Sequence, residues 1–140
     1  MSITEQQVSS GSSSAPLLCG LYFQRQGNVS TGTMLLYGRV TCSGTRGHPV
    51  IASGTITAGI YKSVHTGAQS VSLRIIVIPS DGSSSTSTTV EVPSVPASGG
   101  VHQFATSIPV TVGQMVSVQI VGTSGVSANN PILSLTLEAE

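Results

Sequence analysis

Charged side chains are the scarcest feature of this sequence. Five of its 140 residues are Lys or Arg and five are Asp or Glu, so 7% are charged and the formal net charge is zero, against about 25% charged residues in an average soluble domain. Binding of nucleic acid requires clustered cations, whereas Arg25, Arg39, Arg46, Lys62 and Arg74 are scattered. We therefore expect no nucleic-acid partner. A surface with so little charge also does little to keep copies apart, which suits a subunit packed against neighbours.

Groups for catalysis are equally few. The chain has one aspartate, Asp81, and Glu91 is the only glutamate expected within the folded body. General acid–base chemistry and metal binding need several such groups to converge, but His48, His65 and His102 lie on separate stretches, where we expect solvated loop histidines. No nucleophile-elbow or phosphate-loop motif is present. We expect no enzymatic activity, no metal and no cofactor.

The sequence also lacks a long apolar run. The densest one, residues 75–78, is far shorter than the roughly 18 residues of a membrane span. Residues 1–16 have neither the cationic start nor the apolar stretch of a signal peptide, so we expect synthesis in the cytoplasm and no membrane partner. Cys19 and Cys42 have no metal-type spacing. We expect unpaired buried thiols, with a disulfide between them left open.

Aromatic residues are sparse, and tryptophan is absent. Sugar-binding sandwiches use exposed rings as stacking platforms, and Tyr22, Tyr37 and Tyr61 are the tyrosines available. A place at the edge of the core, with the hydroxyl reaching water, is the more common role for tyrosine. Both interpretations are kept.

Residues 1–16 differ in composition from the rest. They are rich in Ser, Gln and Gly, which predicts a flexible N-terminal arm closed by Pro16. The arm is either a frayed terminus or a segment that becomes ordered on a partner. In the second case the predicted interface consists of Ile3, Val8, Pro16, Leu17 and Leu18.

From residue 17 onward, short apolar runs alternate with turn residues, which is typical of an all-β domain spanning 17–140. The last run is the clearest, with Leu133, Leu135 and Leu137 expected to face the core. About eight strands predict a single antiparallel β-sandwich of jelly-roll type, with an up-and-down barrel as the alternative. The runs are 17–24, 33–42, 50–61, 70–78, 86–92, a short piece around Phe104, 108–112 (an edge position because of Pro109), 115–121 and 133–138.

Residues 54–138 also carry a recognisable series of strand motifs. They run from Gly54-Thr55-Ile56-Thr57 through Val110-Thr111-Val112-Gly113-Gln114-Met115-Val116-Ser117-Val118 to Leu133-Ser134-Leu135-Thr136-Leu137-Glu138. This series resembles the small jelly-roll-like domains of tailed-bacteriophage virion proteins, found in capsid cement (decoration) proteins and in fibre or knob tips. The step from 110 to 118 is also similar to trimeric C1q-like heads.

The resemblance implies a homotrimer on the capsid surface that bridges and stabilises neighbouring major capsid proteins on the head exterior. Residues 1–16 would then be a strap facing the capsid. A tail fibre or knob protein that binds a receptor, and a carbohydrate-binding adhesion module, are the alternatives.

Overall fold

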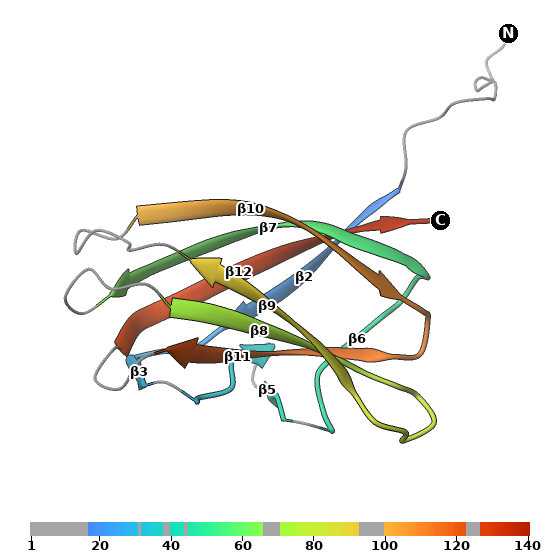
Figure 1. The fold of residues 1–140 in the computed structure, drawn as a ribbon, viewed down its shortest axis with the longest axis horizontal. Coiled ribbons are helices and arrows are strands. Elements are labelled where there is room, and N and C mark those ends of the chain that lie inside the picture. Colours follow the sequence, from blue (N-terminus) through green and yellow to red (C-terminus); the bar gives the residue numbers. More distant parts are fainter. Residues whose placement is uncertain are drawn as a thin grey trace, which may run out of the picture.

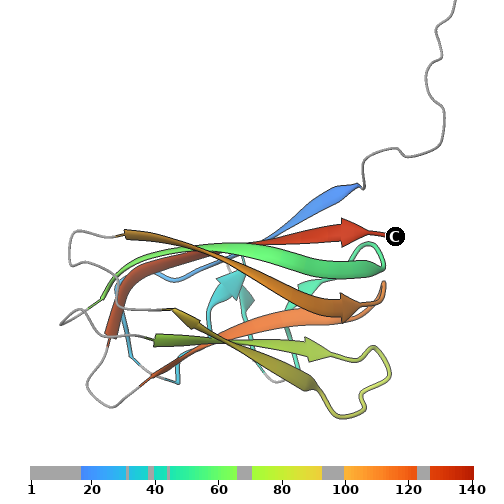
Figure 2. The ribbon, with the colours of Figure 1, turned by 45° about the horizontal axis from the view of Figure 1, so that its top comes forward.

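The protein folds into two antiparallel β-sheets that lie face to face (Figures 1 and 2). The computed structural model describes residues 17–30, 32–37, 40–43, 45–65, 71–92, 100–122 and 127–140. Within these ranges it contains strands and turns but no helix. The all-β prediction is confirmed. None of the described segments forms a helix able to cross a membrane.

The larger sheet has the strand order β10-β7-β12-β2-β4-β5, with β3 pairing to β12. The smaller sheet has the order β6-β11-β8-β9. The bounds in the larger sheet are β2 (Leu18–Gln24), β3 (Asn28–Ser30), β4 (Leu36–Tyr37), β5 (Val40–Thr41), β7 (Gly54–His65), β10 (Gly100–Val110) and β12 (Ser127–Ala139); those in the smaller sheet are β6 (His48–Pro49), β8 (Val71–Ile78), β9 (Thr86–Val92) and β11 (Met115–Gly122).

The strand order is that of a jelly roll. From β6 on, the chain moves repeatedly between the sheets, so β7 ends up between β10 and β12 rather than beside β6 or β8. Eight of the described strands, β2 and β6 to β12, form two four-stranded layers. The jelly-roll prediction is confirmed. The up-and-down barrel is wrong, because neighbours in its sheet would be consecutive in sequence.

The core lies between the layers and follows the predicted alternation. Leu133, Leu135 and Leu137 of β12 are completely buried. Leu73 and Ile75 of β8, in the smaller sheet, belong to the same core. Ile76 and Ile78, on the opposite face of β8, are also buried. β8 is therefore covered on both sides in its second half, whereas Arg74 on the outer side is exposed.

Residues 33–42 do not form the single strand predicted for them. They divide into β4 and β5, which pair with each other. The reason is that this stretch contacts both sheets: Leu36 pairs with Gln24 of β2, while the Leu35 amide donates a hydrogen bond to the Val118 carbonyl of β11. Leu35 and Cys42 of this stretch are buried, whereas Leu36 is half-buried.

Two other predicted runs are in fact one strand. The piece around Phe104 and the run beginning at Ile108 are joined in β10, and a register shift between Ala105 and Ile108 separates them. β10 is the edge strand of its sheet, so the edge position predicted from Pro109 is confirmed.

Both cysteines are free, so the prediction of unpaired thiols is confirmed. Cys42 is buried, and desolvation raises the pKa of its thiol. Cys19 is only half-buried, at the start of β2.

Candidate functional site

The most distinctive surface of the molecule is one side of the larger sheet. In β2, β7, β10 and β12, alternate residues point away from the core, and the antiparallel register places them side by side in rows across the four strands. We call this surface the outer face. Its four rows are Gln24, Ile132, Lys62 and Val101; Tyr22, Ser134, Ile60 and Gln103; Gly20, Thr136, Ala58 and Ala105; and Leu18, Glu138 and Thr55.

The outer face is unusually apolar. The described residues include eight large hydrophobic side chains that are exposed to solvent, and five of them lie on it. Scattered exposed apolar residues need no explanation, but a contiguous group marks a surface for interaction. The five, with their exposed fractions, are Leu18 (60%), Tyr22 (64%), Ile60 (48%), Val101 (57%) and Ile132 (53%).

The outer face carries two charges, one at each end. Lys62 lies in the first row beside Ile132, and Glu138 lies six residues farther along β12. At about 3.3 Å per residue, the two rows are roughly 20 Å apart. The surface between them consists of apolar side chains and of uncharged Gln, Ser and Thr. Its net charge is therefore zero, and nothing in its centre attracts an ionic ligand.

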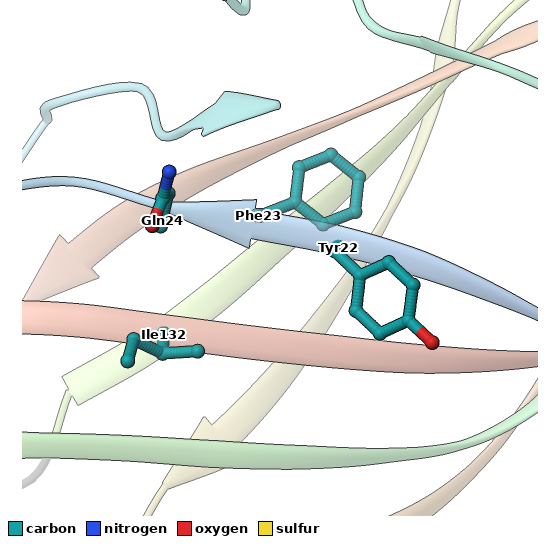
Figure 3. A pocket seen from close by; sticks show the side chains of 4 residues that line it. All are labelled: Tyr22, Phe23, Gln24 and Ile132. Carbon is teal, nitrogen blue, oxygen red and sulfur yellow. The ribbon is translucent and has the colours of Figure 1, made fainter. Parts of the chain in front are cut away.

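Tyr22 dominates one end of the outer face. Its ring lies over Gly20, because a Cβ at Gly20 would overlap the ring atoms. Tyr22 and Phe23 leave β2 in opposite directions, so that Tyr22 stands on the surface while Phe23 enters the core (Figure 3). A hollow of about 200 Å³ is lined by Tyr22, Phe23, Gln24 and Ile132.

A second, wider hollow crosses the middle of the same surface. It measures about 320 Å³ and follows the row of small residues, Ala58, Ala105 and Thr136. The neighbouring row carries the larger side chains of Tyr22 and Ile60, which we call the ridge, with the smaller Ser134 between them. The remaining lining residues are Gly59, Ile60, Gln103 and Phe104. The outer face is thus a ridge beside a trough, both largely apolar.

Three of the five predicted interface residues, Ile3, Val8 and Pro16, lie outside the described residues. Leu17 and Leu18 are strongly exposed where β2 begins, and the Leu17 carbonyl accepts a hydrogen bond from the Ala139 amide. Leu18 belongs to the outer face. The role of all five as an interface stays a prediction.

Sequence reasoning missed Ile60, Val101 and Ile132. Ile60 and Ile132 adjoin the fully buried Tyr61 and Leu133, so each occupies a position where strand alternation calls for a polar residue. These apolar residues at outward positions were the sequence signal that could have indicated the outer face.

The groups considered for catalysis do not converge. Asp81 is fully exposed in a loop, where its Oδ1 accepts hydrogen bonds from the Ser83 amide and hydroxyl, which lower its pKa. Glu91 is exposed on β9. The part of the chain that the structure describes contains no group of three His, Cys, Asp or Glu residues placed to hold a metal ion.

The prediction of solvated loop histidines is wrong for two of the three. His48 is half-buried in β6, with its ring 5.4 Å from that of Tyr37 and 6.0 Å from that of Phe23. His102 is half-buried in β10 and stacks on Phe104 at 6.2 Å. Aromatic neighbours hold both rings against the body, which spacing along the chain could not reveal. The side chain of His65 lies outside the described residues.

The tyrosines have three different environments. Tyr61 is completely buried, and desolvation raises its pKa to about 12 despite a hydrogen bond with the Ser63 side chain. Tyr61 therefore cannot be a stacking platform for a sugar. Tyr37 is half-buried against His48. The ring of Tyr22 is the one of the three that is open to solvent.

Comparisons with known proteins give similarities of shape only. No family model matches the sequence, and no curated protein matches it. The chain is similar to the vertex protein P5 of PRD1, at 12% identity and a TM-score of 0.46, over 86% of this chain and 96% of that one. It is similar to the Eiger TNF of S. frugiperda, at 12% identity and a TM-score of 0.45, over 89% and 95%. It is also similar to a protein in the structure of infectious bursal disease virus strain Gt, at 13% identity and a TM-score of 0.49, over 99% of this chain but 36% of that one.

Proposed function

We propose that this protein is a structural subunit of a virion, and specifically a capsid cement (decoration) protein on the exterior of a bacteriophage head. The observation that carries the proposal is the outer face, which gathers five exposed large hydrophobic side chains and has no net charge and no catalytic group. Such a surface is suited to lying against other protein. The resemblance of residues 54–138 to virion jelly rolls supplies the specific role.

In this role the chain forms a homotrimer that bridges neighbouring major capsid proteins. A standard protein interface buries about 1,600 Å² in total, and repeating a weak contact at many sites makes the attachment strong. Residues 1–16 are the proposed strap, with Ile3 and Val8 as its apolar anchors. The strap leads into Leu17 and Leu18, whose exposed side chains extend the apolar contact onto the folded domain. The protein has no enzymatic activity and uses no cofactor, nucleic acid or membrane.

The decisive test is the protein content of purified virions. Quantitative mass spectrometry should find this chain at a copy number in fixed proportion to the major capsid protein. Absence of the chain, or its presence in only a few copies per particle, would contradict the cement role. A few copies at the tail would instead favour the fibre or knob alternative.

A second experiment tests the strap on expanded heads that lack this protein. Removing residues 1–16 should weaken binding at least tenfold while leaving the domain folded. The matched control keeps the full length and replaces Ile3 and Val8 with Ser; it should bind as weakly as the deletion if apolar anchoring is the cause. Normal decoration by both variants would rule out the strap.

The receptor-binding alternative has one observation in its favour, the exposed ring of Tyr22 beside a hollow. If it is correct, the chain binds a glycan on an array and Tyr22→Ala abolishes that binding. A glycan array with no positive result would count against both the knob and the adhesion-module alternatives.

A further inference from the structure

We infer that the outer face is the surface through which copies of this chain contact one another. The inference deepens the proposed function, and rests on it for the claim that the chain assembles with itself. It assigns that contact to four strands, β2 from Gly20 onward, β12, β7 and β10, and leaves Leu18 and the residues before it for the capsid.

Charge is the first argument for a second copy as the partner. Lys62 and Glu138 lie at opposite ends of the outer face, so the face is neutral as a whole and meets no net repulsion from another outer face. If two faces meet with their strands antiparallel, Lys62 of each copy lies near Glu138 of the other. If several faces surround an axis parallel to the strands, the Lys62 side chains gather at one end of the contact and the Glu138 side chains at the other, both at its solvent-exposed rim. A strongly charged partner has no matching charge on this surface.

The distribution of polarity is the second argument. Interfaces between proteins have an apolar centre and a polar rim. Here the two middle rows of the outer face contain Tyr22 and Ile60 on the ridge and Ala58 and Ala105 in the trough, and the two charges lie in its first and last rows. The ridge of one copy has the chemistry to fill the trough of another. The uncharged side chains of Gln103, Ser134 and Thr136 can form hydrogen bonds with the uncharged polar side chains of a second copy.

The size of the surface sets the conditions of the test. Four strands at about 4.8 Å spacing, over rows roughly 20 Å apart, give a projected area of roughly 400 Å² per copy. A standard interface buries about 800 Å² of accessible surface per partner. The contact is therefore small, and association should be measured up to protein concentrations of several hundred micromolar.

Sedimentation velocity and light scattering on the full chain give the oligomeric state across that range. Wild type should show a mass that is a multiple of the monomer mass. Ile60→Arg places a charge in the centre of the outer face at a half-exposed position, and it should raise the concentration for half-association at least tenfold. The matched control is Ile51→Arg, the same change at an exposed isoleucine outside the outer face, which should associate like wild type.

Thr136→Arg repeats the test from the trough, and circular dichroism checks that each variant is folded. A wild-type chain that stays monomeric at every concentration would overturn the inference. So would Ile60→Arg and Thr136→Arg variants that associate as wild type does, or an Ile51→Arg variant that is equally impaired. Glycan binding by a monomer that is lost in Tyr22→Ala would reassign the face to a sugar.

Failure of this inference is separable from failure of the proposed function. A chain that associates through the outer face but is missing from virions would keep the inference and remove the cement role. A chain abundant in virions whose Ile60→Arg variant still associates would keep the role and remove this assignment of the contact.

Discussion

Three glycines of the larger sheet allow a quantitative test of how its side chains pack. Replacing a strand glycine with alanine normally stabilises a protein by about 0.5–1 kcal/mol, because the unfolded chain loses conformational freedom. What differs between Gly20, Gly54 and Gly59 is the neighbour that a new Cβ would meet. At Gly59 the neighbour is the ring of its cross-strand partner Phe104; at Gly20 it is the ring of Tyr22; at Gly54 it is the backbone carbonyl of Glu138.

Gly59→Ala should destabilise the domain by about 1–3 kcal/mol, the usual cost of overpacking. The ring of Phe104 is packed against the core and must move. Gly20→Ala should stay within about 0.5 kcal/mol of wild type, because the Tyr22 ring is on the surface and can swing away. Gly54→Ala should cost the most, since the Glu138 carbonyl is held in the sheet by its neighbours.

A double-mutant cycle with Phe104→Ala isolates the ring contact. In the Phe104→Ala background, Gly59→Ala has no ring to displace and should become neutral or stabilising by about 0.5 kcal/mol. Urea unfolding followed by circular dichroism gives the four free energies, and the m-values should stay equal. If Gly59→Ala costs the same with and without the ring of Phe104, the packing argument is wrong.

Three further predictions concern single groups. Burial raises the pKa of Tyr61 to about 12 in the folded state, against an ordinary value of 10. Its contribution to the free energy of unfolding, on the order of 3 kcal/mol, is complete below pH 10 and is lost as the pH rises toward 12. A Tyr61→Phe variant should therefore lose less stability over that window, and equal losses in the variant and in wild type would contradict the raised pKa. Cys42 should react with a thiol reagent at least tenfold more slowly than the half-buried Cys19, and equal rates would contradict its burial. Asn130 has φ of 50°, its backbone amide donates a hydrogen bond to the Gly27 carbonyl, and its side-chain oxygen accepts one from the Gly27 amide. Asn130→Ala should destabilise the domain by about 1–2 kcal/mol, and Asn130→Gly by less, because glycine loses the side-chain hydrogen bond but adopts a positive φ without strain. The opposite order of stabilities in thermal melts would refute this account.

Alternation of apolar residues was enough to predict most strands and the class of fold. β12 follows its predicted alternation at Leu133, Leu135 and Leu137, because these residues are paired with β2 on one side and with β7 on the other. The prediction failed between residues 33 and 42, where the Leu35 amide forms a hydrogen bond with the smaller sheet and Leu36 pairs with a strand of the larger sheet. Alternation assumes a single sheet, so it cannot describe a segment shared by two. The order of the strands was also beyond reach, because it depends on pairings between residues far apart in sequence.

The candidate site was predictable only in part. Leu18 was selected for its place next to the arm, whereas the departures from alternation at Ile60 and Ile132 gained meaning only when the register placed Ile60 in the row of Tyr22 and Ile132 in the next row. An isolated apolar residue at an outward position is common, and it gains meaning when three strands bring such residues together. The burial of Tyr61 and the aromatic contacts of His48 likewise depend on neighbours from other strands.

The position of β2 determines how the domain would respond to tension. β2 lies within the larger sheet, paired to β12 over seven residue pairs from Leu18–Glu138 to Gln24–Ile132. A pull on residue 17 along the strand axis would load those pairs in shear, all at once, instead of opening them one by one. If a shell under pressure is held by the residues that precede β2, the load falls on a strand that can slide out of the sheet only by breaking all seven of these pairs together.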